Sequence, residues 1–238
     1  MASAENTEPA VARGAVVLKA LPRTALLMLG VSAALFLPAG RLDWPAAWAL
    51  WAILLAYHLA AMFAMEPELV IERHALFQRR EGRQNRDLVA SILAGWVGPP
   101  SSMILSGLDV HYGWSAFPAA LQVVAGAVMS AGFALAVWAA RTNRFFSAVV
   151  RIQRDRGHCV VMHGPYRVVR HPGYAGFILF AATLPLLLGS WWALITGAIS
   201  VGLYILRAAI EDRTLQRELA GYPEYAHRVR YRLLPGVW

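Results

Sequence analysis

The sequence predicts an all-α fold: a polytopic membrane helix bundle of five or six transmembrane helices with a C-terminal helical hairpin and a ligand site on the cytoplasmic side. Of the 238 residues, 58% are hydrophobic and only 15% are charged, which is too apolar for a soluble globular protein. Apolar residues fill whole segments of about 20 residues on every side, instead of recurring at a helical or strand period. These segments must therefore face lipid or one another.

The expected membrane segments follow from these apolar runs. They cover residues 24–39, 44–65, 88–108, 117–140, 173–188 and 191–206. Gly98, Pro99 and Pro100 interrupt the third run, which predicts a kink or a break in that helix. The last two runs are short for full crossings, so they are expected to form a tilted or partly sunken hairpin.

Basic residues lie in the loops between these segments and give the chain a formal net charge of +8. The loop from residue 141 to 171 holds seven arginines against one acid, Asp155. This is the positive-inside pattern, which places the basic loops in the cytoplasm. The basic residues do not gather into one domain with base-stacking aromatics, so nucleic acid is not an expected partner. A non-enzymatic scaffold or transporter, whose arginines only set topology, is one alternative.

Three regions are predicted on this basis. Residues 1–23 form a cytoplasmic N-terminal tail, residues 24–140 form the N-terminal transmembrane helices, and residues 141–238 form a ligand-binding region with a helical hairpin and a C-terminal lid. The lid is inferred from the mixture of tyrosines and arginines after Gly221, which could fold back over the mouth of the bundle.

A basic and aromatic stretch, residues 164–174, leads into the terminal hairpin. Pro172 suits the first turn of a helix, and the free N–H groups at that helix start favour an anionic group beside Arg170 and His171. For a lone arginine, a topological role at the membrane boundary is the more ordinary explanation. The cluster as a whole favours a binding site.

A second polar cluster follows the terminal hairpin and is expected on the same, cytoplasmic side. Arg207 and Glu211 are separated by four residues, so they share a helix face at the mouth of the bundle. With Arg170 and His171 opposite them, both signs of charge are available to a zwitterionic ligand. The loop before the hairpin and the acidic turn after it are therefore expected to close around one molecule, with an ordinary interfacial ion pair as the simpler alternative.

Other catalytic signatures are absent from the sequence. It has no HExxH or CxxC pattern, no GxSxG elbow and no Walker A or GxGxxG loop, so no metal site and no soluble nucleotide fold are expected. The one cysteine, Cys159, excludes an intramolecular disulfide. A lone intramembrane histidine, His58, is interpreted as a packing residue.

Residues 143–238 resemble the integral-membrane isoprenylcysteine carboxyl methyltransferase and phospholipid methyltransferase superfamily. The motifs that carry the resemblance are Gly157-His158-Cys159-Val160-Val161, Gly164-Pro165-Tyr166, Arg170-His171-Pro172-Gly173-Tyr174 and Glu211-Asp212, with Leu215, Gly221, Tyr225 and Arg228. Asp212 stands where the family often has a second glutamate. The N-terminal half offers no matching signature, which leaves the acceptor open.

The resemblance implies a cytoplasmic site for S-adenosyl-L-methionine. The implied cofactor contacts are Gln153, His158, Cys159, Val160, Val161, Tyr166, His171, Pro172, Gly173, Tyr174 and Glu211, several of them through backbone atoms. Arg207 is implied as the catalytic residue on the substrate side. The acceptor cavity would be built partly by residues 24–140.

The resemblance also implies a membrane methyltransferase with a lipophilic, amphipathic or lipidated acceptor that approaches from the bilayer. An isoprenylcysteine-type carboxylate, methylated on oxygen, is the leading acceptor, and a phospholipid amine or a small thiol is the alternative. An NADPH-dependent reductase of the sterol-reductase type is a further alternative, because such proteins share a related C-terminal layout. A bacterial inner membrane is the assumed location.

Overall fold

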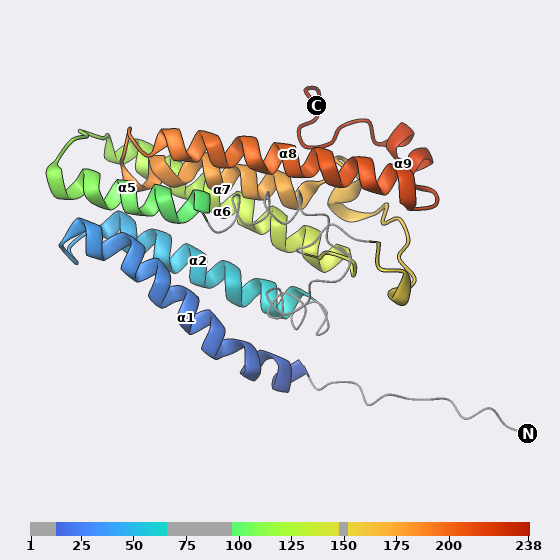
Figure 1. Ribbon diagram of the computed structural model, residues 1–238, viewed down its shortest axis with the longest axis horizontal. Helices are drawn as coiled ribbons and strands as arrows, with labels where there is room; N and C mark the ends of the chain where they lie inside the picture. The colour runs from blue at the N-terminus through green and yellow to red at the C-terminus, as the bar shows by residue number, and fades with distance from the viewer. Residues whose placement is uncertain (1–12, 66–96, 148–151) are drawn as a thin grey trace, which may run out of the picture.

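The computed structural model describes residues 13–65, 97–147 and 152–238, and within these ranges all regular structure is helical. Figure 1 shows long helices that run roughly side by side along one axis, and helices distant in the chain, such as α1 and α5, are in contact. The predicted all-α membrane bundle is confirmed. The helices are α1 Arg13–Ala39, α2 Pro45–Ala64, α5 Gly98–Tyr112, α6 Ala119–Thr142, α7 Pro172–Leu188, α8 Leu194–Glu218 and α9 Tyr222–Arg228, with short 3₁₀ helices η2 Arg154–Arg156 and η3 Gly164–Arg167.

Four of the described helices are long and apolar enough to cross a membrane. They are Ala20–Ala39 within α1, together with α2, α6 and α8. The apolar helix α7 has 17 residues, a length of roughly 26 Å, which is slightly less than the hydrocarbon core of a bilayer. The short α7 agrees with the prediction for the first half of the terminal hairpin.

The helix bounds refine the segments expected from the sequence. Helix α1 begins at Arg13, inside the predicted tail. Helix α8 continues past the apolar run to Glu218, which confirms the shared helix face predicted for Arg207 and Glu211. This half of the hairpin is therefore not short, and good helix formers such as Ala208 and Leu215 favour the longer helix. Helix α5 begins at Gly98, with its prolines in the first turn, where a missing N–H is tolerated. The part of the third apolar run before Val97 lies outside the described residues.

The most extensive helix contact joins α6 and α7. The backbones of Gly132 and Gly176 approach each other closely there. A Cβ atom on Gly176 would clash with the carbonyl oxygen of Gly132. Small residues permit this close approach, which strengthens packing where lipid provides no hydrophobic driving force. The end of α6 is thereby held beside the start of α7.

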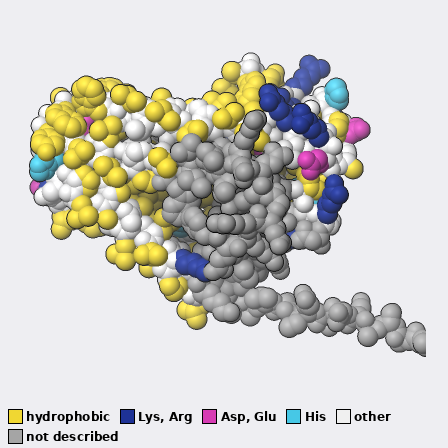
Figure 2. All heavy atoms as spheres, viewed as in Figure 1, with side chains coloured by type: hydrophobic (Ala, Val, Ile, Leu, Met, Phe, Trp, Pro, Cys, Tyr) yellow, Lys and Arg dark blue, Asp and Glu magenta, His cyan; other side chains and the backbone are white. Residues whose placement is uncertain are grey.

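The bundle has one apolar body and one charged end. Its core includes Leu35, Leu50, Met129 and Leu184, which are at most 1% exposed. Figure 2 shows hydrophobic side chains over most of the visible surface, with Lys and Arg gathered near α9. We call this charged end, where α6 finishes and α7 begins, the basic end. At the opposite end, the Ser115 hydroxyl donates to the Asp109 carboxylate over 2.7 Å, and Ser190 of the α7–α8 turn donates to the same oxygen.

Candidate functional site

The connection from α6 to α7 is shaped by a buried glutamine. Gln153 is fully buried; its side-chain amide donates to the Phe145 carbonyl over 2.8 Å, and its Oε1 accepts from Arg156 over 3.0 Å. The backbone N–H of His158 donates to the Gln153 carbonyl at 3.2 Å, and the two rings of His158 and Phe145 lie 4.4 Å apart. Gln153 therefore fixes the conformation of this loop. Both polar groups of its side-chain amide are bonded to other residues of the loop.

An extended segment, Cys159 to Met162, follows this loop. These four residues form no backbone–backbone hydrogen bond with any other residue that the structure describes. Each peptide unit nevertheless carries a strong donor and a strong acceptor. The segment thus presents a row of backbone groups that a planar polar ligand can pair with.

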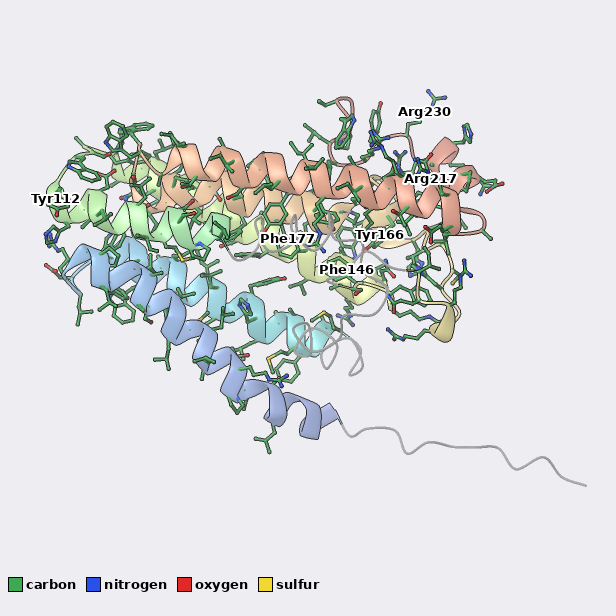
Figure 3. The ribbon with its side chains drawn as sticks, viewed as in Figure 1. Tyr112, Phe146, Tyr166, Phe177, Arg217 and Arg230 are labelled. Atoms are coloured by element: carbon green, nitrogen blue, oxygen red, sulfur yellow. The ribbon has the colours of Figure 1, made fainter. Side chains whose placement is uncertain are left out.

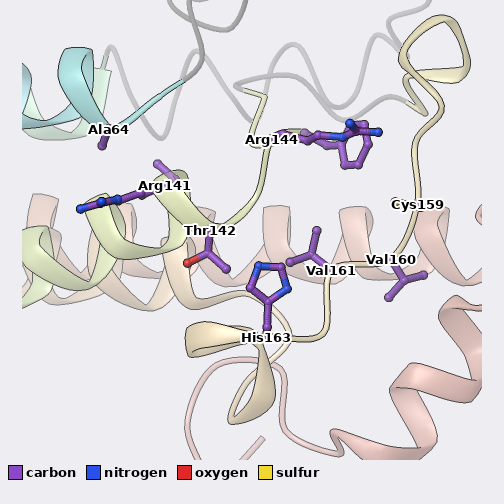
Figure 4. A pocket seen from close by; sticks show the side chains of 10 residues that line it. Ala64, Arg141, Thr142, Arg144, Cys159, Val160, Val161 and His163 are labelled. Carbon is purple, nitrogen blue, oxygen red and sulfur yellow. The ribbon is translucent and has the colours of Figure 1, made fainter.

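A cavity of about 300 Å³ lies between this extended segment and the end of α6 (Figure 4). Its lining combines basic, polar and apolar side chains: Ala64, Ala140, Arg141, Thr142, Arg144, Phe145, Cys159, Val160, Val161 and His163. The volume lies at the lower end of the roughly 300–1,000 Å³ typical of small-molecule pockets. Among the described lining residues there are two arginines and no carboxylate, so the cavity favours a ligand with an anionic group.

The strongest polar cluster of the basic end is centred on Asp212, whose side chain is fully buried. Its Oδ1 accepts from Arg170 Nε at 2.8 Å and lies 3.1 Å from His171 Nε2, while its Oδ2 accepts from Arg232 Nε at 2.9 Å. Tyr222 and Gln216 also donate to this carboxylate, over 3.0 Å and 2.7 Å. We call these six residues the Asp212 clamp.

The Asp212 clamp fastens the chain after α9 to the start of α7. The backbone N–H groups of Arg170 and His171 donate to the carbonyls of Tyr231 and Arg232 over 3.0 Å and 2.9 Å. Burial, and then the nearby charge of Asp212, raises the pKa of Tyr222 far above its usual value, so its hydroxyl remains a proton donor to the carboxylate. These hydrogen bonds attach the C-terminal region to the start of α7, and the lid over the mouth of the bundle stays a prediction.

A second group lies on the neighbouring face of α8. The Tyr174 hydroxyl donates to Glu211 Oε2 over 2.8 Å, and the guanidinium carbon of Arg207 lies 5.6 Å from the centre of the Tyr174 ring. Arg207 is half-buried at the point where the apolar part of α8 ends. Three residues predicted for one site are thus brought together, with the Arg207 cation beside the face of Tyr174 and the Glu211 carboxylate at the Tyr174 hydroxyl.

Tyr166 and Gly173 support the backbone around the site, and neither residue lines the cavity. The Tyr166 hydroxyl donates to the Ala139 carbonyl over 3.4 Å, and its own carbonyl accepts from Tyr225 over 2.7 Å. A Cβ atom on Gly173 would lie 2.5 Å from the Phe146 ring, so a larger residue there would require that ring to move. Pro172 occupies the first turn of α7, as predicted. In Figure 3, Phe146 and Tyr166 lie at the basic end, from which Arg217 and Arg230 project.

The predicted site residues therefore fall into separate groups. Cys159, Val160 and Val161 line the cavity, whereas Tyr166, His171, Tyr174 and Glu211 are not among its lining residues. His171 and Glu211 were expected to face one ligand from two sides, but His171 pairs with Asp212 and Glu211 pairs with Tyr174. Asp212, which is central to the clamp, and the cavity arginines Arg141 and Arg144 were not among the residues predicted for the site.

A protein-family comparison matches residues 123–217 to the isoprenylcysteine carboxyl methyltransferase family. The match begins earlier than the predicted 143 and ends before 238, and it includes α7, most of α6 and nearly all of α8. It therefore contains the extended segment, Arg207, Glu211 and Asp212, but not α9 or the residues after it.

Several curated proteins are similar over part of their length. A probable protein-S-isoprenylcysteine O-methyltransferase from Oryza sativa subsp. indica is 29% identical over 89 residues, which are 37% of this chain and 47% of that protein. Protein-S-isoprenylcysteine O-methyltransferase A from Arabidopsis thaliana is 25% identical over 129 residues, 53% of this chain and 62% of that protein. The enzyme from Schizosaccharomyces pombe is 41% identical over 51 residues, 21% of this chain and 22% of that protein.

The alignment with the rice protein thus spans about half the length of that relative. The organisms are plants and a yeast, so these relatives give no support to the bacterial inner membrane assumed from the sequence. The predicted resemblance itself is confirmed: residues 123–217 of this integral membrane protein match the isoprenylcysteine carboxyl methyltransferase family.

Proposed function

We propose that the protein is a membrane methyltransferase that transfers a methyl group from S-adenosyl-L-methionine to the carboxylate of an isoprenylcysteine-type acceptor. The observation that carries this proposal is the position of the family match, because residues 123–217 contain much of the cavity lining as well as Arg207. The names of the relatives supply the acceptor class. The donor would supply an electrophilic methyl group on a sulfonium centre.

The cavity has chemistry that suits the donor. Arg141 and Arg144 offer cationic partners for its carboxylate, and the backbone groups of the extended segment from Cys159 to Met162 offer donors and acceptors for the edge of an adenine. Phe145 and Val161 add apolar surface to the same lining. On this proposal Cys159, Val160 and Val161 contact the cofactor, while Gln153, His158, Tyr166, Pro172 and Gly173 hold the surrounding backbone.

Arg207 is proposed to bind the acceptor carboxylate. It lies where the apolar part of α8 meets the basic end, so an acceptor with its chain in lipid would bring its carboxylate to this level. The Tyr174 ring, whose hydroxyl is bonded to Glu211, lies beside the guanidinium group. A carboxylate is already a nucleophile and needs no general base, so positioning in a site without water supplies most of the acceleration. Residues 24–140 are proposed to hold the apolar chain; Ala64 of α2 already borders the cavity.

Cys159 allows a direct test of the proposed cofactor, because it is the one cysteine of the chain, is exposed and borders the cavity. We expect S-adenosyl-L-methionine to slow the reaction of Cys159 with a maleimide dye. The slowing should reach roughly tenfold when the donor is at ten times its Kd, because only the unoccupied fraction then reacts. NADPH should leave the rate unchanged.

The control is a Cys159→Ser chain that carries Ala220→Cys, an exposed position outside the cavity lining. Labelling at that position should be insensitive to both nucleotides. Protection of Cys159 by NADPH alone would favour the reductase alternative. Protection by neither nucleotide would show that the cofactor does not bind in this cavity.

A further inference from the structure

The segment after α9, residues 229–238, is an exposed attachment on the side of the bundle. Its backbone is bonded to Arg170 and His171, and the Trp238 carbonyl accepts from the N–H groups of Arg232 and Leu233 over 2.9 Å and 3.0 Å. In Figure 1 the chain turns back along α8 after α9, so that Trp238 lies beside that helix and not beyond its end. The segment therefore has a defined position relative to the bundle.

That position is beside the start of an apolar helix. The backbone bonds place Tyr231 and Arg232 level with Arg170 and His171, immediately before the apolar helix α7 begins at Pro172. The first residues of a membrane helix lie near the headgroups, because the hydrocarbon core accommodates only the apolar part. Tyr231 and Arg232 are therefore held beside the first turn of α7, where the apolar part of that helix begins.

Some side chains of this segment are buried against the protein and others are exposed. Leu233 is 8% exposed, whereas its neighbour Leu234 is 57% exposed and Val237 is 74% exposed. Arg228 and Arg230 are exposed beside them, and residues 228–238 include no acidic residue. Figure 2 shows apolar side chains next to Lys and Arg side chains at this edge of the molecule.

We propose that residues 228–238 dock on anionic phospholipid headgroups of the same bilayer. Leu234 and Val237 would enter the boundary between headgroups and acyl chains, and Arg228 and Arg230 would contact the phosphates. Arg232 is not available for this contact, because its guanidinium group pairs with Asp212 and its guanidinium carbon lies 4.8 Å from the centre of the Trp238 ring. The Asp212 clamp therefore connects the lipid-bound segment to the start of α7. This inference does not depend on methyl transfer.

The test places an environment-sensitive dye at Val237→Cys in a Cys159→Ser chain, reconstituted in lipid discs that contain a nitroxide-labelled lipid. In discs with phosphatidylglycerol the dye should be quenched strongly, and in discs of phosphatidylcholine alone only weakly. Two arginines at an anionic surface should raise the docked-to-undocked ratio roughly 30-fold. Arg228→Gln combined with Arg230→Gln should abolish the difference between the two lipids.

The matched control is the dye at Ala220→Cys, an exposed position before α9, which should be quenched weakly in both kinds of disc. Quenching at Val237→Cys that equals this control would overturn the docking, and an acidic protein as the true partner would produce that result. Equal, strong quenching in both lipids would overturn the preference for anionic headgroups. Both labelled chains retain the Asp212 clamp, so a loss of folding is not expected.

Discussion

Asp212→Ala is expected to lower the free energy of unfolding by about 3–5 kcal/mol, because it leaves a buried guanidinium group without its counter-charge. Arg170 is 7% exposed and would lose both of its bonds to this carboxylate. His171, Tyr222 and Arg232 would lose the same partner. The change is measured from the midpoint of denaturation of the purified protein in detergent.

Two further variants separate charge from position. Glu218→Ala, at an exposed site on the same helix, should alter stability by less than about 0.5 kcal/mol. Asp212→Glu keeps the charge and should recover a large part of the loss. A midpoint for Asp212→Ala equal to that of the Glu218→Ala control would contradict the central role given to this carboxylate.

Arg207→Ala is expected to reduce kcat about 10²- to 10³-fold, in the range found when a single positioned donor is removed from an active site. The Kd for the methyl donor should change only slightly, because Arg207 is not among the residues that line the cavity. Steady-state rates and equilibrium donor binding measure the two effects separately. A loss of donor affinity with an unchanged kcat would contradict the proposed contact with the acceptor.

Two arginine variants provide the comparison. Arg217→Ala removes an exposed arginine from the same helix and should leave kcat unchanged. Arg207→Lys retains the charge but not the planar pair of donors, so it should recover only part of the activity. Equal effects of Arg207→Ala and Arg217→Ala would indicate a general electrostatic contribution instead of a specific contact.

The helices of the bundle could be predicted because long apolar runs permit few other structures in a membrane. The hydrogen-bond partners of the two acidic residues on α8 could not be predicted. Glu211 and Asp212 are adjacent, and successive side chains on a helix point about 100° apart, so only one can face the start of α7. Sequence spacing favoured Glu211 through its separation from Arg207, whereas packing turns Asp212 inward. A buried carboxylate needs hydrogen-bond donors. The polar residues that follow Asp212, such as Gln216 and Tyr222, were therefore the signal available in the sequence.

The cavity was anticipated in part. The motif from His158 to Val161 indicated one wall, but Arg141 and Arg144 were attributed to membrane topology, which accounts for arginines at any cytoplasmic helix end. Their position depends on the close approach of α6 to α7 at Gly132 and Gly176, and contacts so distant along the chain leave no local pattern. Pairing of the chain after α9 with residues 170–171 is likewise a long-range contact.

Transfer of a radiolabelled methyl group from S-adenosyl-L-methionine tests the proposed function most directly. The purified protein in lipid discs would be given an S-isoprenylated cysteine with a free carboxylate, and in parallel the same compound with its carboxylate amidated. The account predicts label in the free acid alone, released as methanol by mild base, as a methyl ester requires. No incorporation, or base-stable label in lipid amines or thiols, would contradict methylation of an isoprenylcysteine carboxylate.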